Sequence, residues 1–188
     1  MNISLRKANA VQGAIQEVLN SISIDTSIEL NEFQDVSAEL QQANDTLFAN
    51  DARRQKLLLA FYNIRGLVGT ANASCGINTS LAKGAFIDKR IAQLSEIANA
   101  KPVTDLAVVN GKLSKLRDSK DTDRGFGYRD SVYTSVVAKN QIEQAQAEIK
   151  NLKKQKRELN DEVLELNVKT EIPLSDDVVE VLQAEGLV

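Results

Sequence analysis

A seam of apolar residues late in the chain constrains the fold more than any other feature. Its members recur in alternating steps of four and three residues, and Lys156 is the one polar residue among them. They are Ala138, Ile142, Ala145, Ile149, Leu152, Lys156, Leu159, Val163 and Leu166. This spacing is typical of helices that pack side by side. The sequence therefore predicts a long helix over 138–166 that forms part of an antiparallel hairpin or coiled coil.

A second seam predicts another long helix, over 35–72. It passes through Val36, Leu40, Ala43, Leu47, Leu57, Phe61, Ile64, Val68 and Ala71. Asn50 and Arg54 occupy its two central positions. A polar residue at such a position fixes register or oligomeric state at a cost in stability. Asn50, Arg54 and Lys156 therefore predict a homo-oligomer, in which Lys156 needs a carboxylate, a carbonyl or water as its partner.

Shorter elements complete the prediction, which is one mainly α domain over 1–188 with a long antiparallel coiled-coil-like helical hairpin and a small β element. The other predicted elements are a helix over 3–22, a strand over 24–30, helices over 80–118 interrupted at Pro102, a loop over 119–130, a strand over 131–137, and a strand and helix over 168–186. "TSIEL" at 26–30 echoes "TEIPL" at 170–174, which indicates that these two strands share a sheet.

The residue types that the chain lacks exclude several kinds of catalytic site. There is no histidine, which excludes Ser-His-Asp and Cys-His catalysis and His-ligated metal sites. Cys75 is the only cysteine, and without a histidine to activate it we interpret it as a packing residue. The acidic residues are spread along predicted helix faces rather than clustered. We therefore expect a protein that is not an enzyme and that uses no metal and no cofactor.

Charge and hydropathy indicate the expected surroundings of the protein. The formal net charge is -3, whereas general nucleic-acid binders carry a basic surplus. The basic stretch at 150–162 alternates with acidic residues and favours a solvated helix face over a nucleic-acid patch. There is no apolar run of about 20 residues and no signal peptide at the first residue. We expect a cytoplasmic protein that contacts neither membrane nor nucleic acid.

The segment "DTDRGFGYRDSVYTS", residues 121–135, concentrates side chains that bind small anions. Arg124 and Arg129 offer guanidinium groups for phosphate, and Phe126, Tyr128 and Tyr133 offer rings that stack on a base. The two glycines among them allow the backbone to approach a ligand. This grouping predicts a ligand-binding loop. The alternative is a surface turn with Arg–Asp pairs, which contribute little to stability.

Arg65 and Asn72 would complete the same predicted pocket. Both lie in "FYNIRGLVGTANASCGIN", residues 61–78, where polar side chains and small residues gather near the end of a long helix. The alternative interpretation, which the composition favours for this stretch, is a tight crossing of two helices with capping asparagines. The two glycines at 66 and 69 are not a nucleotide-binding fingerprint, because no strand precedes them.

Two stretches, "INTSLAKGAFIDKRIAQL" and "KKQKRELNDEVLELNVKTEI", carry a resemblance. They resemble a loose group of uncharacterised all-helical bacterial and phage proteins with an Asn-Thr turn, a following helix bearing Asp and Arg, and a late "LN-x-x-TE-[IL]" end. The matching positions are Asn78, Thr79, Asp88, Arg90, Asn167, Thr170, Glu171 and Ile172. Val168 stands where that group has an aromatic residue. The resemblance implies an all-helical fold and no particular activity.

A second resemblance is one of type. Small, acidic, helical phage proteins with arginine and aromatic loops are similar to the signal-sequestering sponges that bind nucleotides made by bacterial defence systems. This resemblance implies a non-enzymatic oligomer that sequesters a small anionic, nucleotide-like ligand in the host cytoplasm. The alternative, which the two seams support, is a structural or adaptor coiled-coil protein that mediates protein–protein assembly.

Overall fold

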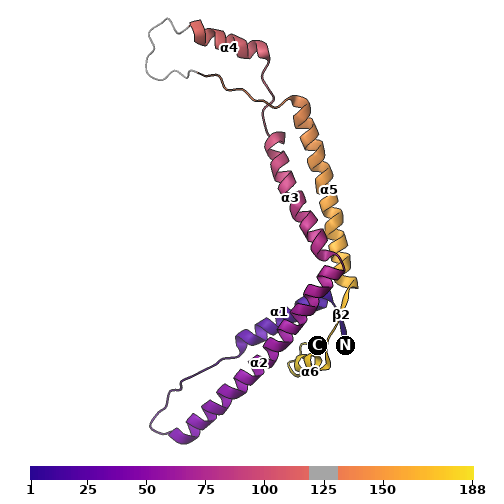
Figure 1. The fold of residues 1–188 in the computed structure, drawn as a ribbon. Coiled ribbons are helices and arrows are strands. Elements are labelled where there is room, and N and C mark those ends of the chain that lie inside the picture. Colours follow the sequence, from indigo (N-terminus) through magenta and orange to yellow (C-terminus); the bar gives the residue numbers. More distant parts are fainter. Residues whose placement is uncertain (119–130) are drawn as a thin grey trace. The chain divides into compact units, whose positions relative to one another are not determined.

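A computed structural model describes residues 1–118 and 131–188 (Figure 1). The elements in chain order are β1 (Asn2–Ser4), α1 (Leu5–Ser21), α2 (Val36–Ser74), α3 (Ile77–Ala98), α4 (Leu106–Asp118), α5 (Lys139–Lys169), β2 (Glu171–Pro173) and α6 (Asp176–Ala184). The predicted mainly α fold with helical hairpins and a small β element is confirmed. Contacts divide the described chain into two compact units, residues 1–80 with 161–188 and residues 81–160, whereas the sequence predicts a single domain.

The first unit is built on the packing of α1 against α2 (Figure 1). Helix α1 begins after Ser4, whose side chain accepts a hydrogen bond of 3.2 Å from the backbone N–H of Lys7. One face of each helix is buried. The buried residues are Leu5, Ala8, Val11, Ile15 and Leu19 of α1 and Leu57, Ala60, Ile64 and Val68 of α2. The predicted seam of α2 is therefore confirmed from Leu57 onward, whereas Val36 and Leu40 at its start are exposed.

The small sheet joins the two ends of this unit. Strands β1 and β2 pair antiparallel, with Asn2 opposite Pro173, Ile3 opposite Ile172 and Ser4 opposite Glu171. Both isoleucines of the central pair are buried in the core. The predicted C-terminal strand is confirmed, but its partner is residues 2–4 and not residues 24–30. Residues 2–4 are free to pair because the N-cap at Ser4 starts helix α1 later than predicted.

The predicted strand over 24–30 is wrong, since these residues form no regular structure. Directly after α1, two backbone carbonyl groups accept hydrogen bonds from side chains of α2. The carbonyl of Ser23 accepts a hydrogen bond of 3.1 Å from Asn50, and that of Ile22 accepts one of 3.5 Å from Arg54. The two polar residues of the α2 seam are thus bound within their own chain. They explain how this segment is held and no longer argue for an oligomer.

The second unit contains the antiparallel packing of α3 against α5 (Figure 1). Arg90 donates a hydrogen bond of 3.0 Å to Glu148, and Lys156 pairs with Asp88, the carboxylate partner that its seam position predicts. Ile87 and Leu94 of α3 and Ala145 of α5 are buried. Every predicted seam residue of α5 is buried or half-buried. Each long helix thus has a shorter helix as its partner, a pairing that differs from the predicted one between the two long helices.

The predicted strand over 131–137 is also wrong, because residues 132–138 have no regular structure. Its backbone makes one hydrogen bond to a distant segment, as a strand would: the N–H of Val103 donates to the carbonyl of Val137 at 2.8 Å. The N–H of Val137 itself donates to the side chain of Ser135 at 3.1 Å. A β-branched segment without a second strand to pair with cannot extend this contact into a sheet. The predicted loop over 119–130 lies outside the described residues.

The helices of the described chain lack the combination of length and apolar character needed to cross a bilayer.

Candidate functional site

Helix α2 carries two apolar stripes. The first is the seam against α1, and the second lies on the face turned away from the core. We call this second set the outer stripe, which consists of Phe48, Ala52, Gln55, Leu59, Tyr62 and Gly66, again in steps of four and three. Phe48, Leu59 and Tyr62 are 62%, 67% and 63% exposed. Large apolar side chains that gather on one exposed helix face are typical of a contact surface.

The exposed ring of Tyr62 in the outer stripe contacts Phe61, a residue that packs against the core. Phe61 is half-buried and packs against the buried cluster. Its ring meets the ring of Tyr62 edge to face, with centroids 5.3 Å apart and planes at 87°. This geometry is favourable for aromatic pairs. The Tyr62 ring therefore contacts a core-packed ring of its own chain while it remains 63% exposed.

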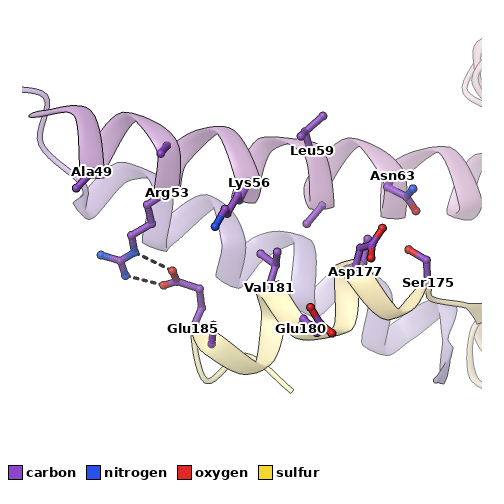
Figure 2. A pocket seen from close by; sticks show the side chains of 14 residues that line it. Ala49, Arg53, Lys56, Leu59, Asn63, Ser175, Asp177, Glu180, Val181 and Glu185 are labelled. Carbon is purple, nitrogen blue, oxygen red and sulfur yellow. Dashed lines mark hydrogen bonds and ion pairs between the residues drawn. The ribbon is translucent and has the colours of Figure 1, made fainter.

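A groove lies beside the outer stripe, between α2 and α6, with a volume of about 770 Å³ (Figure 2). We call it the α2–α6 groove. Small and apolar side chains form most of its lining, and Leu59 belongs to both the groove and the outer stripe. Its charged residues are segregated: Arg53 and Lys56 come from α2, whereas Asp177, Glu180 and Glu185 come from α6 or its end (Figure 2).

Helix α6 is positioned by its buried face and by its ends. Val178 and Leu182 are buried in the core of the first unit. Two aspartates in the first turn interact favourably with the positive end of the helix dipole. Ser175 occupies the N-cap position, but its side chain makes no capping hydrogen bond. Gly186 ends the helix in the left-handed region, with φ of 66°.

One end of the groove is closed by a bidentate ion pair between the two helices. Arg53 donates two hydrogen bonds to the carboxylate of Glu185, of 2.7 Å and 2.6 Å (Figure 2). This geometry matches guanidinium to carboxylate and adds orientation to the attraction. The hydrogen bonds from Arg53, together with its positive charge, lower the pKa of Glu185, while partial burial opposes the shift. The pair links residues 132 positions apart in the chain.

This pKa shift predicts an acid-sensitive contribution to stability. Because the pKa of Glu185 is lower in the folded state, its contribution is complete above the unfolded value of about 4.3 and is lost as the pH falls through the folded value. Replacement of Glu185 by glutamine should lower the free energy of unfolding by about 0.5–1 kcal/mol at pH 7, since half of Arg53 remains in solvent. At pH 3 the difference should be smaller, as measured by urea unfolding.

The matched control is Glu180→Gln, which removes a carboxylate of the same helix that has no ion-pair partner in the described part of the chain. It should change the unfolding midpoint much less at pH 7. Equal effects of the two substitutions would show that the net charge of α6, and not the bidentate pair, is what matters.

The groove and the stripe together form one candidate surface of the first unit. Its apolar area is flanked by the amine of Lys56 and by the carboxylates of Asp177 and Glu180. Lys56 is a free cation, because it has no ion-pair partner in residues 1–118 and 131–188. Within the same described ranges, no three His, Cys, Asp or Glu side chains are grouped so that they could hold a metal ion. The surface can bind an apolar partner and orient it by charge.

The residues predicted from sequence to bind a ligand lie in different places. Arg124, Phe126, Tyr128 and Arg129 lie outside the described residues. Tyr133 belongs to the unit 81–160 and is 82% exposed. Arg65 and Asn72 belong to α2 in the first unit. Their spacing of seven residues places them on one side of that helix, about 10 Å apart along its axis. The joint pocket of all seven residues stays a prediction.

Sequence reasoning missed the outer stripe, although its signal is present. Positions 48, 52, 55, 59, 62 and 66 repeat the same steps as the seam on the opposite face of the helix. A search for a second periodic set within one helix would have found it. The α2–α6 groove carries no such signal, because its two walls lie more than a hundred residues apart in the chain.

Comparisons with known proteins add no relative. Neither the protein-family models, nor the curated proteins, nor the solved structures contain a match to this chain.

Proposed function

We propose that the protein is a non-enzymatic assembly protein that binds another protein chain through helix α2. The observation that supports this proposal is the outer stripe, whose three large apolar side chains are at least 62% exposed at heptad spacing. Exposed stripes with this spacing are the surfaces that a partner helix covers. This is the structural or adaptor role that the sequence analysis names as its alternative.

The test uses Lys56, which lies beside the outer stripe and has no ion-pair partner among the described residues. Tagged protein is treated with an amine-reactive cross-linker in its own host and purified, and the cross-linked peptides are identified by mass spectrometry. We expect peptides that join Lys56 to a second protein chain. Replacement of Phe48, Leu59 and Tyr62 by glutamine should remove them, because the apolar contact is lost.

The matched control is Leu164→Gln, which changes an equally exposed leucine on α5. Its cross-links from Lys56 should equal those of the unchanged protein. The absence of such cross-links in the unchanged protein, or their persistence in the triple variant, would refute the assembly role of the outer stripe.

A second candidate function is sequestration of a nucleotide-like ligand in the segment 121–135. It is favoured by the exposed ring of Tyr133 beside a stretch that holds two arginines and two further aromatic residues. Guanidinium groups bind phosphate, and rings stack on bases. If the protein sequesters such a ligand, the same protein purified without cross-linker should release a molecule of nucleotide mass in native mass spectrometry. Arg124→Ala with Arg129→Ala should abolish that release, and no release from the unchanged protein would remove this candidate.

A further inference from the structure

We infer that the partner of the outer stripe is the outer stripe of a second copy, packed antiparallel about a two-fold axis at the level of Leu57. The inference rests on the proposed assembly function and names its partner. A two-fold contact uses the same patch on both copies, so the patch must be complementary to itself. The stripe meets this requirement in the sizes of its side chains and in its charges.

The sizes match because two of the three large residues face a small one. With the axis at the level of Leu57, Phe48 of one copy lies opposite Gly66 of the other. In the same register Tyr62 lies opposite Ala52, and Leu59 lies opposite Gln55. Alternation of large and small side chains across facing helices is what close packing requires. Both members of each pair are already present in one copy of the stripe.

The charges match along one flank of the stripe. Asp51 and Arg65 are exposed on the same side of α2, and in residues 1–118 and 131–188 neither has a partner from its own chain. The antiparallel register places Asp51 of each copy within about one helical turn of Arg65 of the other, so the pair forms twice. Leu58, also exposed, lies between them and meets its own counterpart near the axis.

A parallel arrangement loses the Asp51–Arg65 contacts. In a parallel two-fold pair, the flank that carries Asp51 and Arg65 in one copy faces the opposite flank of the other copy, so these two residues cannot pair with each other. On the other flank of the antiparallel pair the two Lys56 side chains approach each other near the axis. Each also lines the α2–α6 groove together with Asp177 and Glu180, whose carboxylates offset this positive charge.

The first test exchanges the charges. Asp51→Arg or Arg65→Asp alone replaces two attractive contacts with two repulsive ones, and either variant should weaken the dimer about tenfold or more in sedimentation equilibrium. The double variant restores both contacts and should return to within about threefold of the unchanged protein. Asp51 and Arg65 are both exposed, and circular dichroism of each variant is the check that the helices remain. A double variant as weak as the single ones, or an unchanged protein that is monomeric at tens of micromolar, would overturn the inference.

The second test measures the direction of the pairing. Single nitroxide labels are placed at Gln41→Cys or Thr70→Cys, both exposed, in a Cys75→Ser background. In the antiparallel register the two labels of a dimer lie about 50 Å apart at 41 and about 40 Å apart at 70, from the rise of 1.5 Å per residue. Pulsed electron paramagnetic resonance resolves these distances. A short distance at both positions indicates parallel pairing and overturns the register.

The two proposals fail in different ways. A monomeric chain whose Lys56 still cross-links to a different protein overturns the inference and leaves the assembly function intact. A chain that is monomeric and gives no cross-link from Lys56 overturns both.

Discussion

Replacement of Leu57 by alanine is expected to lower the free energy of unfolding of the unit 1–80 with 161–188 by about 3 kcal/mol. Leu57 is 0% exposed, at the centre of the core that α1, α2 and α6 share. Truncation removes buried methyl groups and leaves a cavity, because the surrounding helices close around it only in part. Urea unfolding followed by far-ultraviolet circular dichroism measures the change.

The control is Leu164→Ala, the same substitution at a helical leucine of the same unit that is 65% exposed. It should lower the free energy of unfolding by less than about 0.5 kcal/mol, since the side chain has little contact to lose. A loss at Leu164 as large as that at Leu57 would contradict the assignment of the core.

The second large effect is expected from Leu182→Asp, which should detach α6 from α2. Leu182 is fully buried, and a carboxylate in its place has no buried partner. The cost of burying that group is about 4 kcal/mol or more, so the helix leaves its site rather than bury it. Hydrogen exchange should then show lost protection across residues 176–184 and along the part of α2 that lines the groove.

Gln183→Asp is the matched control, because it adds the same charge to the neighbouring exposed position of α6. It should leave the protection of residues 176–184 within about twofold of the unchanged protein. If both variants lose protection equally, charge on α6 and not burial of Leu182 determines docking.

The helices of this protein are predictable because their signal is local and repeated. The seam positions of α2 and α5 recur over many turns, and their burial follows the predicted pattern along α5 and in the second half of α2. Lys156 illustrates how far such reasoning reaches, since its seam position alone required a polar partner and Asp88 supplies it. The bounds of both long helices, 36–74 and 139–169, lie within three residues of the predicted ones.

The strands were predicted less well, because three-residue strands hold too little alternation to stand out. Residues 24–30 alternate as a strand does, but the carbonyls just before them bind Asn50 and Arg54, and no strand in the described part of the chain pairs with them. The true partner of β2 lies at residues 2–4, a stretch that reads from its apolar spacing as part of a helix. Tertiary contacts decided both cases, as they often do for short segments.

The candidate surface was likewise predictable from the sequence only in part. The outer stripe is periodic and could have been found from the sequence, whereas the α2–α6 groove depends on a contact such as Arg53 with Glu185, which no local pattern announces. Among the residues predicted for ligand binding, only Arg65 and Asn72 share an element of the described structure.

The pairing of β1 with β2 has a consequence for the order in which the protein folds. The unit 1–80 with 161–188 is interrupted in the chain by the other unit, whose residues 81–160 are contiguous. During synthesis the contiguous unit is complete while its interrupted neighbour still lacks β2 and α6. The core face around Leu57 therefore stays exposed until the last part of the chain is made. Bringing the two segments of this unit together closes a loop that contains residues 81–160, and the entropic cost of closure grows only slowly with loop length. We expect a ribosome-bound intermediate to expose apolar surface on α2 that the finished protein covers, and premature association through this surface would compete with folding.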